Sequence, residues 1–77
     1  MTQVRIIEIV QVGETTERDL YHDRVLVIPQ WKVRLEYLGP DHLMGQHGNP
    51  HFSAKDELDA FRKFRRFADR NHMEIVE

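Results

Sequence analysis

The chain has 77 residues, of which 40% are hydrophobic and 31% are charged, and its formal net charge is −2. This length predicts one domain, residues 1–77, and the composition excludes a collagen-like, disordered or membrane-embedded chain. Because the chain has no cysteine, disulfides cannot supplement its small core, which leaves a metal ion or a partner as extra stabilisation. The nearly balanced charge favours neither a dedicated nucleic-acid binder nor an acidic mimic of DNA.

No segment has the features of a membrane span or a secretory signal. The longest unbroken apolar run covers only residues 25–28, whereas a span needs about 20 residues. The first residues show no basic stretch leading into an apolar one, so no signal peptide is indicated. We therefore expect a cytoplasmic protein without a membrane partner.

Residues 4–12 have the composition of a β-strand, because β-branched side chains dominate and neither glycine nor proline intervenes. Alternation places Val4 and Ile6 on one face and Ile7 and Ile9 on the other. A strand with apolar residues on both faces is usually covered on both sides.

Residues 13–23 are mostly polar and predict a connecting loop. The next extended segment covers residues 24–38 and contains Pro29. Its alternating apolar face is formed by Trp31, Val33, Leu35 and Tyr37. Proline cannot donate to a strand ladder and disfavours a tight turn of the hairpin type. We therefore predict one long strand, bent or bulged at Pro29, that pairs with the first strand as a hairpin.

Glycine and proline residues in 39–52 predict a long loop. Ser53 is the predicted N-cap of a helix, with Asp56 three residues further on. The apolar stripe of this helix has helical spacing and consists of Ala54, Leu58, Phe61, Phe64 and Ala68. Asn71 is expected to end the helix in the left-handed conformation, and residues 73–76 predict a short final strand.

The order of these elements predicts the fold class α+β. We expect a small β-β-α-β domain in which a three-stranded, mainly antiparallel sheet packs on one amphipathic helix.

The densest group of potential metal ligands lies in the predicted loop and consists of Asp41, His42, His47 and His51. Imidazole and carboxylate groups suit zinc, and a structural zinc would stabilise a small core. The spacing matches no HExxH pair, however, and no cysteine reinforces the site. A metal-binding protein is therefore an alternative hypothesis, and the favoured interpretation is a solvated loop without a cofactor.

The predicted helix carries a basic surface, with four cations within residues 62–66. The candidate partner-binding cations are Arg62, Lys63, Arg66 and Arg70. Such a face can contact nucleic-acid phosphates or an acidic protein. The alternative is a solvated face neutralised by the helical pairs Lys55–Asp59, Asp59–Lys63, Arg65–Asp69 and Arg66–Asp69.

Apolar residues that one helix cannot cover are a third candidate surface. Phe67 lies outside the predicted stripe, and Ile7 and Ile9 lie on the second face of the first strand. Either the loops 13–23 and 39–52 fold over this face, or these residues form an interface with a homodimer mate or a target.

The sequence offers few residues suited to nucleophilic catalysis. Ser53 is the only serine, cysteine is absent, and there is no nucleophile elbow or phosphate-binding loop. We therefore predict that the chain is not an enzyme.

The predicted function is that of a small, non-enzymatic protein–protein interaction module. In length and β-β-α-β order the chain is similar to small cytosolic proteins of phages and mobile elements, including inhibitors of host enzymes such as anti-CRISPR proteins. This resemblance implies an inhibitor that docks on a larger host complex and blocks it sterically. The alternatives are a nucleic-acid-associated regulator that uses the face 62–66 and a metal-binding protein that uses the loop 41–51.

Overall fold

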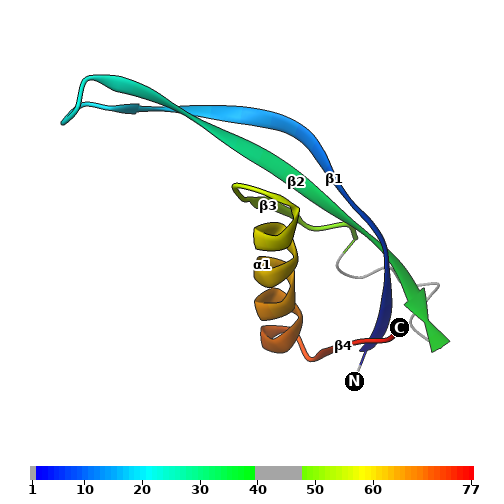
Figure 1. The fold of residues 1–77 in the computed structure, drawn as a ribbon. Helices are drawn as coiled ribbons and strands as arrows, with labels where there is room; N and C mark the ends of the chain where they lie inside the picture. Colours follow the sequence, from blue (N-terminus) through cyan, green and yellow to red (C-terminus); the bar gives the residue numbers. More distant parts are fainter. Residues whose placement is uncertain (1, 40–47) are drawn as a thin grey trace.

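A computed structural model describes residues 2–39 and 48–77 as one helix on a curled, mixed sheet of four strands (Figure 1). The elements are β1 (Thr2–Asp19), β2 (Arg24–Leu38), β3 (His51–Ser53), α1 (Glu57–Arg70) and β4 (Met73–Ile75). The strand order is β3-β2-β1-β4, in which β2 is antiparallel to both neighbours and β4 is parallel to β1. The predicted α+β class is confirmed. The sheet has a fourth strand, β3, and one parallel pair, which the prediction of a three-stranded sheet did not include.

The hairpin of β1 and β2 is much longer on the β1 side than the sequence predicted. Residues 13–23 were expected to form a loop, but β1 continues to Asp19 and only residues 20–23 turn. Each polar residue here has a partner in β2, with Thr16 opposite Val27 and Thr15 opposite Ile28. The backbone ladder with β2 therefore keeps residues 13–19 extended, although their side chains show no strand pattern.

The long second strand with Pro29 inside it is confirmed, and the irregularities lie in β1. Register shifts occur between Ile6 and Glu8 and between Gln11 and Gly13, so Ile7 and Val12 are the extra residues of two bulges. Pro29 is tolerated because its backbone faces the outer edge of β2. Its carbonyl accepts the N–H of Ala54 at 3.1 Å, and no donor is required from the proline.

The bulge at Ile7 reverses the alternation and corrects the predicted faces of β1. Ile6 lies opposite Leu35, and Ile9 lies opposite Val33. Ile9 therefore joins the face that carries Val4 and packs against the core, although strict alternation placed it on the other side. One inserted residue is sufficient, because side chains in a strand have a period of two.

The core lies between α1 and the sheet and consists of Val4, Val33, Leu35, Phe64, Ala68 and Met73. The predicted stripe is only partly correct, because Leu58 is 57% exposed. Phe67 instead packs on the core, with its ring centroid 5.8 Å from that of Phe52. Phe52 comes from β3, the strand that was not predicted, and α1 is rotated toward it.

The N-cap of α1 differs from the prediction, whereas Asn71 ends the helix as predicted but not in the left-handed conformation. The N-cap is Asp56, whose Oδ1 accepts the N–H of Asp59 at 2.8 Å, and not Ser53, which belongs to β3. Asn71 is the C-cap with φ −103°, and the residue in the left-handed region is His72 with φ 55°.

The far half of the hairpin extends well past the helix. We call residues 12–29, which form this two-stranded projection and its turn, the arm. Figure 1 shows the arm reaching beyond the end of α1, in cyan and green. It accounts for the elongated shape of the molecule, whose principal extents are 50 × 21 × 20 Å.

Candidate interaction surface

Exposed apolar side chains are concentrated on the arm. At its turn, Leu20 is 81% exposed and Tyr21 is 91% exposed. Along β2, Val25 and Val27 are 63% and 56% exposed, and Leu26 is also exposed. Isolated apolar side chains on a surface are ordinary. Several of them on one projection, on both of its faces, make the arm a candidate interaction surface.

Both edges of the arm are open within the described residues. β4 flanks β1 only at Thr2–Val4, and β3 flanks β2 only from Gln30 to Lys32. A two-stranded ribbon without a further strand is only marginally stable in water. The arm therefore carries unused capacity for backbone pairing as well as exposed apolar surface.

The turn of the arm is organised around Asp19. Its Oδ1 accepts the backbone N–H of Tyr21 at 3.0 Å and of His22 at 3.2 Å. Its Oδ2 lies 2.8 Å from Nδ1 of His22 and 3.5 Å from Nε of Arg24. The hydrogen bond from the His22 ring, followed by those from the backbone and Arg24, lowers the pKa of Asp19 below its ordinary value of 3.8.

We expect the turn to loosen in acid. Because the pKa of Asp19 is lower in the folded chain, its stabilisation is present above pH 3.8 and is lost as the pH falls through the folded value. Amide hydrogen exchange of Tyr21 and His22 should accelerate in Asp19→Asn at neutral pH. Asp23→Asn is the control, since Asp23 contacts Arg18 at 3.5 Å, whereas the N–H groups of Tyr21 and His22 donate to Asp19. Equal exchange in the wild type and Asp19→Asn would contradict this role.

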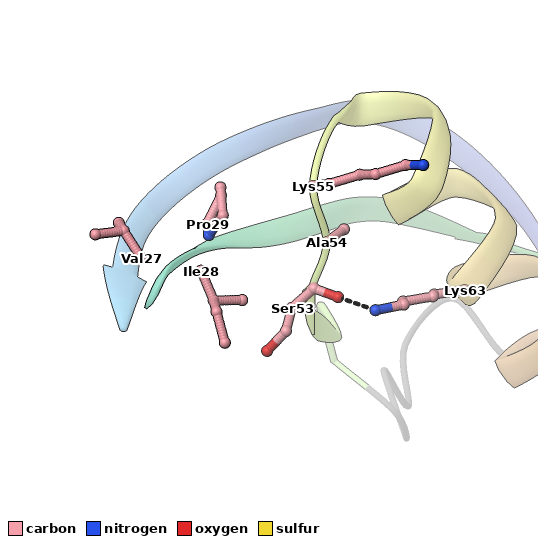
Figure 2. A pocket seen from close by; sticks show the side chains of 7 residues that line it. All are labelled: Val27, Ile28, Pro29, Ser53, Ala54, Lys55 and Lys63. Carbon is pink, nitrogen blue, oxygen red and sulfur yellow. Dashed lines mark hydrogen bonds between the residues drawn. The ribbon is translucent and has the colours of Figure 1, made fainter. Parts of the chain in front are cut away.

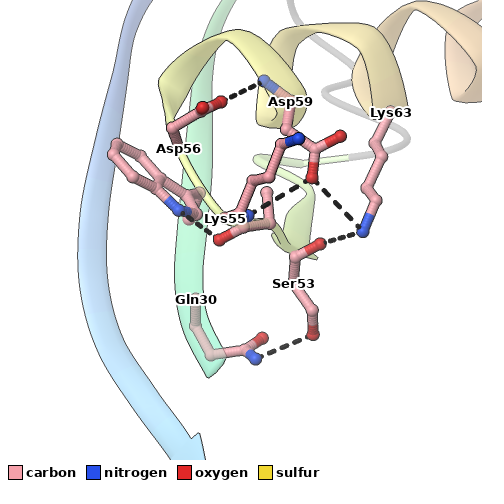
Figure 3. A network of polar contacts seen from close by, with 8 residues as sticks. Gln30, Ser53, Lys55, Asp56, Asp59 and Lys63 are labelled. Carbon is pink, nitrogen blue, oxygen red and sulfur yellow. Dashed lines mark hydrogen bonds and ion pairs between the residues drawn. The ribbon is translucent and has the colours of Figure 1, made fainter. Parts of the chain in front are cut away.

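A network of polar contacts fixes the base of the arm to the segment that leads into α1 (Figure 3). Nε2 of Gln30 donates to Oγ of Ser53 at 2.7 Å and to Oγ1 of Thr15 at 3.1 Å. Nε1 of Trp31 donates to the carbonyl of Ala54 at 2.9 Å. The base of the arm is therefore held in place while its far end is free of the helix.

A shallow groove lies between this base and the start of α1 (Figure 2). It is lined by Val27, Ile28, Pro29, Ser53, Ala54, Lys55 and Lys63. Lys63 donates to the Ser53 carbonyl and lies 3.8 Å from Asp59. The groove combines apolar side chains of β2 with two cations.

The predicted basic face of the helix is brought together on α1. Arg62, Arg66 and Arg70 are exposed, and Lys63 is half-buried by its contacts with Ser53 and Asp59. Of the predicted helical ion pairs, only Asp59–Lys63 is present among the described residues. The arginines are therefore neutralised less than the sequence suggested.

The three apolar candidates lie in different environments and do not form one patch. Ile7 is exposed at its bulge. Ile9 lines a shallow surface groove with Leu58 and Phe61, and Phe67 is half-buried against Phe52. The loops 13–23 and 39–52 were one predicted cover for the second sheet face, but 13–23 is built into the arm. That face carries the ion pairs Arg5–Glu36 at 3.7 Å and Glu8–Arg34 at 2.7 Å.

The proposed histidine site falls mainly outside the described residues. Asp41, His42 and His47 are not among them, and His51 is an exposed residue of β3. Within residues 2–39 and 48–77, no group of three or more His, Cys, Asp or Glu residues could hold a metal ion. Metal binding by the loop stays a prediction.

Sequence reasoning missed the arm as a surface. The signal in the sequence is the apolar run 25–28, which needs cover on both faces of its strand. Its partner strand is polar, so the run could not be buried within the hairpin alone.

No protein-family model, curated protein or solved structure matches the chain. Among the described residues, no helix is long and apolar enough to cross a membrane.

Proposed function

We propose that the protein is a non-enzymatic protein–protein interaction module that docks through its arm. The observation that carries this proposal is the exposure of Leu20 and Tyr21 at the end of a projecting hairpin. An exposed tyrosine at the end of a projection supplies a large contact area at a low cost in side-chain entropy, which is typical of binding hot spots.

The anchored base of the arm supports the same interpretation. The Gln30–Ser53 and Trp31–Ala54 hydrogen bonds fix the base of the arm, so the arm leaves the core in a defined direction. Preorganisation of this kind reduces the entropy lost on binding. In the favoured version, the turn enters a cleft of a larger host complex and blocks it sterically, as in inhibitors made by phages and mobile elements.

The experiment is capture of partners from a host extract with the tagged protein. We expect Leu20→Ser with Tyr21→Ser to abolish capture of a protein that the wild type retains, because both apolar anchors are removed. Leu58→Ser is the control, since it removes an exposed apolar side chain from α1, away from the arm. Unchanged capture by the double variant would contradict docking through the turn.

A second candidate is a nucleic-acid-associated regulator. The specific observation is that Arg62, Arg65, Arg66 and Arg70 form no ion pair with described residues. Free arginines on one helix can contact phosphates, and such binding falls steeply with salt. Nuclease treatment of the extract separates the two functions, because only a protein partner is retained after it.

A further inference from the structure

The outer edge of β2 in the arm is short, apolar and open. Ala54 bonds to the carbonyl of Pro29, Pro50 accepts the N–H of Val33, and Asn49 accepts the N–H of Leu35. In β2, the odd-numbered residues Pro29, Val33 and Leu35 therefore direct their backbone groups outward. By the alternation of an antiparallel ladder, so do Val25 and Val27. Within the described residues no strand pairs with these two.

The two edges of the arm differ in chemistry. The residues of β1 whose backbones face outward in the arm are Glu14, Thr16 and Arg18, as their pairing with Pro29, Val27 and Val25 requires. Charged residues on an edge discourage further pairing. The β2 edge instead carries the run 25–28, apolar on both faces of the ribbon, so burial there removes apolar surface from water on both sides.

We propose that two copies of the chain pair through the β2 edges of their arms, antiparallel and across a two-fold axis at Leu26. This inference rests on the proposed function, because both treat the arm as the element that makes the interaction. In this register Val25 of each copy lies opposite Val27 of the other, and the outward N–H and C=O groups of both residues are all used. The surface is self-complementary, which a two-fold contact requires.

The register also limits the ladder at both ends. Pro29 has no N–H, and its carbonyl is already bonded to Ala54. Asp23 begins the turn with φ 48°. The paired segment is therefore 24–28. Because Ala54 occupies the position outside Pro29, Asp23 of the other copy turns away from the ladder there, beside the groove that contains Lys55 (Figure 2). A carboxylate and an ammonium group are therefore brought near each other at each end.

Proline substitutions test which edge is used. Val27→Pro removes an outward donor while leaving the β1–β2 ladder intact, as Pro29 already does. Thr16→Pro is the matched control, because it removes the outward donor directly across the ribbon, on the β1 edge. Amide spectra of both variants establish that the hairpin has formed.

The measurement is sedimentation equilibrium. Protein concentrations of up to about 200 µM are needed, because so short a ladder buries less surface than a standard interface and is expected to bind weakly. We expect a wild-type dimer, a dissociation constant raised about tenfold or more in Val27→Pro by the loss of two hydrogen bonds, and no change in Thr16→Pro. A monomeric wild type would overturn the self-pairing. So would a dimer that is weakened by Thr16→Pro and not by Val27→Pro.

A cysteine scan tests the register. The chain has no cysteine, so Leu26→Cys introduces a single thiol at the proposed two-fold axis. We expect rapid oxidation to a covalent dimer, because directly opposed residues at such a site lie within disulfide reach. Glu17→Cys, opposite Leu26 within the hairpin, should stay monomeric. Equal cross-linking of the two would overturn the register.

The outcomes also separate this inference from the proposed function. A monomeric protein that still captures a host protein through Leu20 and Tyr21 rejects self-pairing alone. If the protein is a dimer and the turn variants still capture the host protein as the wild type does, docking through the turn is rejected and the self-pairing is retained.

Discussion

Phe64→Ala should cost about 3–5 kcal/mol of the free energy of unfolding. The side chain of Phe64 in α1 is fully buried against the sheet. Its ring centroid lies 6.4 Å from that of Phe52 and 6.2 Å from that of Phe67. A chain of this length is usually stable by about 4–12 kcal/mol. Much of the stability is therefore expected to depend on this one side chain, and urea denaturation measures the loss.

Leu58→Ala is the control for this prediction. The sequence pattern places Leu58 and Phe64 on the same apolar stripe, but Leu58 is 57% exposed. Its substitution should cost less than about 1 kcal/mol, because little apolar surface is lost from the interior. Equal losses for the two variants would contradict the rotation of α1 toward Phe52.

Removing the arm should separate stability from binding. Replacement of residues 14–29 by Asn-Gly joins Gly13 to Gln30, which are already paired, and Asn-Gly favours the two-residue hairpin turn. The buried residues of the core lie outside this segment. We expect a folded protein whose affinity for its protein partner is at least about 100-fold lower, because the exposed anchors are gone.

Circular dichroism and thermal melting check that the shortened chain folds, and titration with the captured partner measures its affinity. The turn variant Leu20→Ser with Tyr21→Ser provides the comparison, because it keeps the arm and removes only the anchors. Retained affinity in the shortened chain would place the binding surface on the core domain instead, with the basic face of α1 as the next candidate.

The second strand and the helix were predictable because each is defined by its own residues. The alternation from Trp31 to Tyr37 gives one apolar face whatever the strand pairs with. A helical spacing of apolar residues also predicts α1 without knowledge of its neighbours. The direction in which α1 faces was not predictable, since Phe52 in the three-residue strand β3 determines it, and so short a strand has no pattern.

The candidate surface was predicted only in part. The exposed arginines of α1 followed from helical geometry. Ile9 was misplaced because a single bulge at Ile7 reversed the alternation, and bulges leave little trace in a sequence. The arm was missed because residues 13–19 are polar and become a strand only by pairing with β2.

The sequence by itself determined an α+β chain with no cysteine, a long second strand and one amphipathic helix. Only the tertiary structure decided that half of the hairpin projects beyond the helix with its apolar residues uncovered. The physical reason is that local patterns report what each segment prefers, whereas exposure depends on which other segments reach it. A single short helix covers only one end of a hairpin this long.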